Sequence, residues 1–258
     1  MTPNLSRGMQ SVERSHVRLA LLATTVVIVI GLVLAVVWVL TPLGPTPEAL
    51  EALGSDGTVT VTALAEGWLF APTDGPAAAG LVLYPGGRVD ARSYAPLARA
   101  IAQRGYAVAL ASMPLNLAVL DPGRAETLMD SAPEVVRWAV GGHSLGGAMA
   151  AAYATTEDDR IGGLALLAAY PAASTDLTAR GLAVLSVIGT EDRVVDPEVF
   201  AEAVERLPAD TTYLTLDGGN HAQFGDYGPQ TRDGDATITR EEQIRATADA
   251  IAGLLEHL

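Results

Sequence analysis

The chain has 258 residues, and its 49% hydrophobic content is enough to bury the core of one ordinary domain. It contains no cysteine, which excludes disulfide bonds, thiolate nucleophiles and cysteine-ligated zinc. Its 16 basic and 30 acidic residues give a formal net charge of −14, which argues against a nucleic acid partner.

The N-terminus combines a short basic segment with a long apolar one. Residues 1–18 hold three arginines and a single acidic residue, Glu13, and residues 19–40 follow without any charge. A helix over these 22 residues would span about 33 Å, against roughly 30 Å of bilayer hydrocarbon. We therefore predict a cytoplasmic tail at 1–18 and a transmembrane signal anchor at 19–40, with Trp38 near the interface.

A cleaved signal peptide is the alternative for this region. Its apolar core is usually about 7–15 residues long and ends in small residues at a cleavage site. Here the apolar run is longer and ends in Trp38-Val39-Leu40-Thr41-Pro42, which favours an uncleaved anchor. The excess of arginine before the anchor predicts a single-pass protein of the cell membrane, with the rest of the chain extracytoplasmic.

The remainder is interpreted as a linker followed by one globular domain. Residues 41–57 are rich in Pro and Gly and are expected to form the linker, with a short helix at 48–53. From residue 58 onward, short apolar strands alternate with helices, which predicts an α/β domain with a mostly parallel sheet covered on both faces. The expected strands are 58–64, 67–71, 80–84, 106–111, 135–140, 163–169, 182–188 and 211–216, and the expected helices 94–104, 124–130, 148–154, 197–207 and 240–257.

The most informative stretch is Gly141-Gly142-His143-Ser144-Leu145-Gly146-Gly147, between an apolar strand and a run of small residues typical of a helix. A serine at such a sharp turn must adopt a strained backbone conformation, and the glycines let the chain pass close on either side. The hydroxyl of Ser144 would then stand above a helix N-terminus, whose free N–H groups favour an anion.

This stretch has the G-x-S-x-G pattern of a nucleophile elbow, and through it the sequence resembles the α/β-hydrolase superfamily from about Thr58 to the C-terminus. The resemblance implies the α/β-hydrolase fold and a Ser-acid-His triad in that chain order. At the level of a branch, the chain is similar to dienelactone-hydrolase-like and carboxylesterase-like proteins. Dienelactone hydrolases use a cysteine nucleophile, however, and this chain has none.

A serine nucleophile needs a base, and His221 is the best of the four histidines. His16 precedes the apolar segment, His257 lies on the final helix, and His143 stands beside Ser144, where strand alternation is expected to turn it elsewhere. His221 directly follows the last strand, where the superfamily places its base. We therefore predict His221 as the general base.

The base needs a carboxylate to orient it, and Asp192 is the best candidate between Ser144 and His221. It follows a buried strand and a Gly-Thr turn, in a form that resembles the acid loop of the family. Glu191 and Asp196 are nearby alternatives, although Asp196 precedes Pro197 and is expected to cap a helix. Asp226, after the histidine, is expected to be a loop contact.

The negative oxygen of a tetrahedral intermediate needs preset N–H donors. The resemblance assigns one donor to Leu145, the residue after the nucleophile, and the other to the loop Pro85-Gly86-Gly87-Arg88. Pro85 stands where the family often has a histidine and donates no N–H. Gly87 is therefore the preferred donor and Arg88 the second choice.

These motifs predict a serine hydrolase that cleaves a small-molecule or lipid acyl ester without metal or cofactor, because neither paired-histidine metal spacing nor a phosphate-binding glycine loop occurs. The segment 170–181 is too short for a lid domain. Two alternatives remain open: an envelope acyltransferase with the same triad, and a non-catalytic binding protein on a hydrolase fold.

Overall fold

The computed structural model describes residues 21–34, 36–37 and 41–258. The predicted tail at 1–18, and residues 19–20, 35 and 38–40 of the predicted anchor, lie outside the described residues. The chain divides into two units, Met1–Pro42 and Leu43–Leu258. In the first unit residues 21–34 and 36–37 are helical, and their large apolar side chains are about half exposed or more. Within the described ranges, no helix combines the length and the apolar character needed to cross a membrane.

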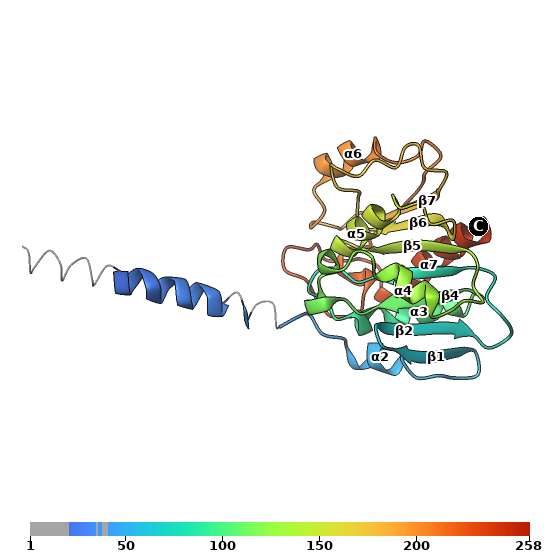
Figure 1. Ribbon diagram of the computed structural model, residues 1–258, viewed down its shortest axis with the longest axis horizontal. Helices are drawn as coiled ribbons and strands as arrows, with labels where there is room; N and C mark the ends of the chain where they lie inside the picture. Colours follow the sequence, from blue (N-terminus) through green and yellow to red (C-terminus); the bar gives the residue numbers. More distant parts are fainter. Residues whose placement is uncertain (1–20, 35, 38–40) are drawn as a thin grey trace, which may run out of the picture. The chain divides into compact units, whose positions relative to one another are not determined.

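The second unit is built on one eight-stranded sheet (Figure 1). Its strand order is β1-β2-β4-β3-β5-β6-β7-β8. The pairs β1–β2 and β2–β4 are antiparallel, and every other neighbouring pair is parallel. The strands are β1 Val59–Leu64, β2 Gly67–Pro72, β3 Gly80–Tyr84, β4 Ala107–Ala111, β5 Trp138–His143, β6 Ile161–Leu167, β7 Ala183–Gly189 and β8 Thr212–Leu216.

Helices cover both faces of this sheet, as the near-continuous apolar strands predict. One core lies between the sheet and helices α3 and α7, and a second lies between the opposite face and helices α4 and α5. Neighbouring residues of β3 alternate between them, with Leu81 and Leu83 in the first core and Val82 and Tyr84 in the second. The α-helices are α2 Pro47–Glu51, α3 Ala95–Ala102, α4 Arg124–Asp130, α5 Leu145–Tyr153, α6 Pro197–Val204 and α7 Arg240–Glu256, and the short 3-10 helices are η1 Ala91–Tyr94, η2 Pro114–Asn116, η3 Ala118–Leu120 and η4 Ala222–Phe224.

The structure confirms the predicted α/β fold, but it moves the boundaries around the central strand. Strand β5 covers Trp138–His143, three residues later than the predicted 135–140. The buried indole N–H of Trp138 donates to the carbonyl oxygen of Val135 at 2.8 Å, and residues 135–137 lie outside the strand, after a turn at 133–134. Helix α5 begins at Leu145, earlier than the predicted 148, because the glycines after Ser144 form its first turn.

Other segments also differ from the prediction. The expected helix 94–104 is shorter, α3 at Ala95–Ala102, and the 3-10 helix η1 at Ala91–Tyr94 precedes it. The compact unit begins at Leu43, whereas the sequence places a linker as far as residue 57. The N–H of Leu43 donates to the carbonyl oxygen of Arg88 at 2.8 Å, and Ala49 of helix α2 is fully buried. Part of the predicted linker therefore packs on the domain.

Candidate active site

Ser144 sits on the turn between β5 and α5 with φ 53° and ψ −123°, a strained conformation for a residue with a side chain. The surrounding backbone leaves no room for the turn to relax. A Cβ atom on Gly146 would lie 2.3 Å from the carbonyl oxygen of Pro85, and one on Gly142 would lie 2.6 Å from the backbone of Gly146. The two glycines therefore allow the close approach that holds Ser144 at the end of the strand.

Helix α5 starts directly after Ser144 in the chain, and no side chain of the described residues caps its N-terminus. Its first hydrogen bond runs from the N–H of Ala148 to the carbonyl oxygen of Ser144, at 3.2 Å. The N–H groups of Leu145, Gly146 and Gly147 thus precede the helical ladder and have no acceptor within it. This end of the helix is suited to hold negative charge.

The predicted acid and base meet in space. Nδ1 of His221 lies 2.8 Å from Oδ2 of Asp192, and the two side chains are 2% and 0% exposed. Oδ1 of Asp192 accepts the N–H groups of Val194 and Val195, at 2.8 and 2.9 Å, so the carboxylate is fixed by its own loop. Since an ionised carboxylate only accepts, Nδ1 of His221 is the donor in this contact, and Nε2 is the ring nitrogen that faces away from Asp192.

The environment of Asp192 favours its charged form. Burial acts to raise the pKa of this carboxyl, but the hydrogen bond and charge of His221, with the N–H groups of Val195 and Val194, outweigh burial and lower the pKa below its usual value. Asp192 is therefore ionised at neutral pH, as an orienting partner of a histidine must be.

The loops that carry Asp192 and His221 follow neighbouring strands, β7 and β8, and are bonded to each other. The N–H of Glu191 donates to the carbonyl oxygen of Gly219 at 2.8 Å, and the N–H of Gly218 donates to Oγ1 of Thr190 at 2.9 Å. Parallel pairing places both loops at the carboxyl edge of the sheet, the same edge at which Ser144 follows β5.

The competing acids have other partners. Glu191 pairs with Arg193 at 3.1 Å. Asp196 caps helix α6 by accepting the N–H groups of Glu198 and Val199, as expected from the Pro that follows it. Asp226, expected to be a loop contact, is buried and lies 2.8 Å from Arg240.

In the predicted oxyanion loop, Gly87 is the residue whose N–H is available. The N–H of Arg88 is donated to the carbonyl oxygen of Asn116 at 2.7 Å, and that of Gly86 to the hydroxyl of Tyr94 at 3.0 Å. For Gly87, the described part of the chain offers no acceptor. A Cβ atom on Gly87 would lie 3.0 Å from the side chain of Leu145, so the two predicted donors are neighbours.

His143 is closer to the site than its strand position suggests. Its buried ring has its centroid 4.4 Å from that of His221, and its Nδ1 lies 2.7 Å from the hydroxyl of Tyr94. The Tyr94 hydroxyl also accepts the N–H of Gly86, which links this histidine to the oxyanion loop. Burial, with the neighbouring His221 as a smaller cause, holds the pKa of His143 well below its usual range, so the ring is neutral.

Two polar residues hold the loop of His221 and were missed by the sequence analysis. Asp233 accepts the N–H groups of His221 and Ala222, at 3.2 and 2.8 Å. The buried side chain of Gln243 bonds to both the N–H and the carbonyl oxygen of Asn220, at 3.1 and 2.8 Å. Asp233 lies in a polar stretch typical of a surface turn, and Gln243 looks like one more polar residue on a helix, so no local pattern marks either.

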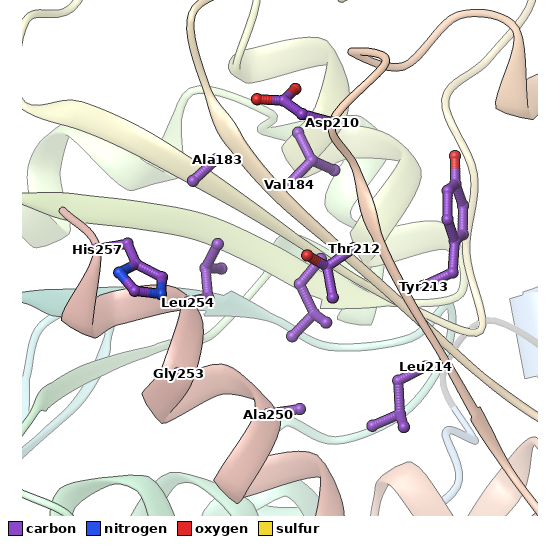
Figure 2. Close-up of a pocket in the computed structure, with 11 residues that line it drawn as sticks. Ala183, Val184, Asp210, Thr212, Tyr213, Leu214, Ala250, Gly253, Leu254 and His257 are labelled. Atoms are coloured by element: carbon purple, nitrogen blue, oxygen red, sulfur yellow. The ribbon is translucent and has the colours of Figure 1, made fainter.

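A cavity of about 480 Å³ lies elsewhere, between β7, β8 and helix α7 (Figure 2). Ala183 and Thr212, which begin their strands, line it together with Leu254 and His257 of the C-terminal region. It therefore opens at the end of these strands opposite to the Asp192 and His221 loops. For metals, the described residues contain no group of three or more His, Asp or Glu side chains placed to hold an ion.

The comparison with protein families decides the identity of the fold. Residues 80–245, more than half of the chain, match the Alpha/beta hydrolase family. The chain belongs to this family. The match includes the elbow, the acid loop and the base loop.

Solved structures of three proteins share the fold at low sequence identity. A predicted CIB-like hydrolase from Thermoplasma acidophilum has a TM-score of 0.56 at 16% identity, covering 76% of this chain and 100% of its own. The esterase domain of a Rhodothermus marinus protein has 0.56 at 13%, covering 76% and 96%. A dienelactone hydrolase-like promiscuous phosphotriesterase from metagenomic libraries has 0.55 at 20%, covering 78% and 99%. No curated protein sequence matches this alpha/beta hydrolase.

Proposed function

We propose that this alpha/beta hydrolase is a serine hydrolase that cleaves carboxylic esters through an acyl-enzyme, with Ser144 as nucleophile, His221 as base and Asp192 as the orienting acid. The observation that supports it best is the 2.8 Å contact between His221 Nδ1 and Asp192 Oδ2. This contact lies at the sheet edge where the strained Ser144 follows β5. A buried carboxylate–histidine pair and a half-buried serine at the same sheet edge form the arrangement that activates a serine hydroxyl.

In the proposed reaction Ser144 Oγ attacks the ester carbonyl carbon while Nε2 of His221 takes the hydroxyl proton. The resulting imidazolium is stabilised by the Asp192 carboxylate through Nδ1. His221 then gives the proton to the departing alkoxide, so the alcohol leaves and the acyl group stays on Ser144. Water, deprotonated by His221, repeats the attack, releases the carboxylic acid and returns the proton to Ser144.

The tetrahedral oxyanion formed in each step would be held by the N–H groups of Leu145 and Gly87. The N–H of Gly87 has no acceptor among the described residues and lies close to Leu145, which supports this assignment over Arg88, whose N–H is already donated to Asn116. The names of two structural neighbours, an esterase and a phosphotriesterase, also favour an ester as substrate.

We also propose that residues 19–40 anchor the chain in the cell membrane, with the hydrolase domain outside the cytoplasm. The support is the uncharged run itself, its arginine-rich flank, and the exposed apolar side chains of residues 21–34 and 36–37. A reporter fused after Leu258 should be active only outside the cytoplasm. Cytoplasmic activity would contradict this orientation.

Labelling with a fluorophosphonate probe tests the catalytic proposal directly. The full-length protein should be labelled at Ser144, and both Ser144→Ala and His221→Ala should abolish labelling while remaining folded. A folded wild-type protein that is neither labelled nor able to cleave short aryl esters would refute the proposal.

A further inference from the structure

The segment between η4 and α7, residues 226–239, folds back over the loop of His221, and we refer to it as the strap. The amide of Asn220 donates to the carbonyl oxygen of Gly234 at 2.8 Å, and the N–H of Thr237 donates to that of Gly218 at 2.8 Å. The strap thus bonds to the loop of His221 at two positions, Gly218 and Asn220. Asp233, which bonds to the backbone of His221, lies on this strap.

Asp233 uses both carboxylate oxygens on the backbone around His221. Oδ1 accepts the N–H of His221 at 3.2 Å, and Oδ2 accepts the N–H of Ala222 at 2.8 Å. Oδ1 also accepts the N–H of Gly234, the next residue of the strap, at 2.9 Å, and this bond orients the carboxylate. Bonds from N–H groups to a carboxylate are among the stronger hydrogen bonds in proteins.

We infer that Asp233 is a positioning residue for His221, an inference that rests on the proposed function. His221 is held at two points: Asp192 fixes the ring through Nδ1, and Asp233 fixes the backbone from which the ring projects. With both points held, Nε2 has a single location relative to Ser144. A displacement of about 1 Å in a reacting group can cost about 100-fold in rate, so a second anchor has a kinetic consequence.

Asp226 provides a matched control on the same strap. It too is buried, but its carboxylate pairs with Arg240, and among the described residues it makes no hydrogen bond to His221. Replacing either carboxylate weakens the strap. Only the loss of Asp233 removes bonds to the backbone of the base.

The experiment compares Asp233→Ala, Asp233→Asn and Asp226→Asn in the purified full-length protein. We expect Asp233→Ala to lower kcat and the rate of fluorophosphonate labelling by about 10- to 100-fold, with little change in KM. Asp233→Asn keeps the acceptor for His221 but presents an amide to Ala222, so its loss should be smaller. Asp226→Asn should lower the melting temperature and leave kcat within about twofold at temperatures well below melting.

A spectroscopic signature separates positioning from general support. The His221 Nδ1 proton, held by Asp192, should give a low-field proton NMR signal that is absent from Asp192→Ala. We expect this signal to shift or broaden in Asp233→Ala and to stay in place in Asp226→Asn. The inference is wrong if folded Asp233→Ala keeps both the signal and a kcat within about twofold of wild type.

The NMR measurement also separates failure of this inference from failure of the proposed function. It needs no substrate, because the His221–Asp192 contact exists in the free protein. A wild type without hydrolase activity but with a signal that depends on Asp233 would refute the catalytic proposal and leave the positioning role intact. If Asp233→Ala does not fold, Asp233→Asn takes its place in both measurements.

Discussion

The elbow and the base loop hold neighbouring parts of one site by different means. At the elbow the constraint is steric. A Cβ atom on Gly142 would clash with the backbone of Gly146, and one on Gly146 would clash with the carbonyl oxygen of Pro85. The loop of His221 is held by side chains that bond to its backbone, from Asp233, Gln243 and Thr190. The elbow's sequence pattern therefore lies in a few consecutive residues, although Gly146 also packs against the distant backbone of Pro85, while the base loop depends on side chains 12 to 28 positions away.

This difference predicts different responses to substitution. A side chain added at a glycine of the elbow would clash with backbone atoms and should therefore lower the stability of the whole domain. A change among the supports of the base loop removes hydrogen bonds and should affect activity more than the fold. The largest effects are expected at the reacting groups themselves, which both regions position.

Ser144→Ala should give the largest effect. In the proposed mechanism it removes the nucleophile, and we expect kcat for a short aryl ester to fall by about 10⁴- to 10⁶-fold. Because the triad acts as a unit, Ser144→Ala/His221→Ala should be no slower than either single variant. Ester turnover that survives in Ser144→Ala would contradict the assignment of the nucleophile.

Asp192→Asn tests the link between the acid loop and the base loop. An amide in place of the carboxylate favours the wrong tautomer of His221, so kcat should fall by about 10⁴-fold. Steady-state kinetics on the same ester give the value. The matched variant Glu191→Gln, next to it in the chain and paired with Arg193 instead, should retain nearly full activity.

Gly146→Ala tests the steric constraint at the elbow. Its Cβ atom would meet the carbonyl oxygens of Pro85 and Tyr84 at 2.3 and 2.6 Å, so we expect a loss of about 3 kcal/mol or more in the free energy of unfolding. Gly253→Ala in helix α7 meets no atom within 4 Å and should stabilise the domain by up to about 1 kcal/mol. Urea denaturation of both variants measures the contrast, and equal effects would refute it.

Gln243→Leu tests the support of the base loop from helix α7. It leaves the buried N–H and carbonyl oxygen of Asn220 without their partner, which should cost about 2 kcal/mol and lower kcat by about tenfold. Thr247→Val is the control, since it removes a buried hydrogen bond in the same helix that does not reach the loop. It should cost about 1 kcal/mol and leave kcat unchanged.

The smallest expected effect is the pH dependence that Asp192 gives to stability. Its pKa in the folded protein is lowered, so its contribution is present above the pKa of the unfolded chain and is lost as pH falls through the folded pKa. The difference in unfolding free energy between wild type and Asp192→Asn should be constant near neutrality and shrink below about pH 5. A difference that grows toward acid pH would contradict the sign.

Sequence patterns predicted the regular elements well, since each depends on nearby residues, and the reacting groups that they indicate stay predictions. The apolar strands and the order Ser144, Asp192, His221 could be found in the chain, and the structure brings Asp192 and His221 into contact. Boundaries were less accurate at two places. Strand β5 starts three residues later than predicted, at Trp138, and the hydrogen bond of Leu43 to the distant Arg88 brings part of the predicted linker into the domain.

By itself, the sequence determined the fold class and the elbow, because strand periodicity and glycine placement act over a few residues. Only the tertiary structure decided how His221 is held. Asp233, Gln243 and His143 are ordinary polar residues in the sequence, and they reach His221 and its loop because the strap, helix α7 and strand β5 converge there. Hydrogen bonds between distant segments leave no periodic pattern in the chain, which is why no local signal could reveal them.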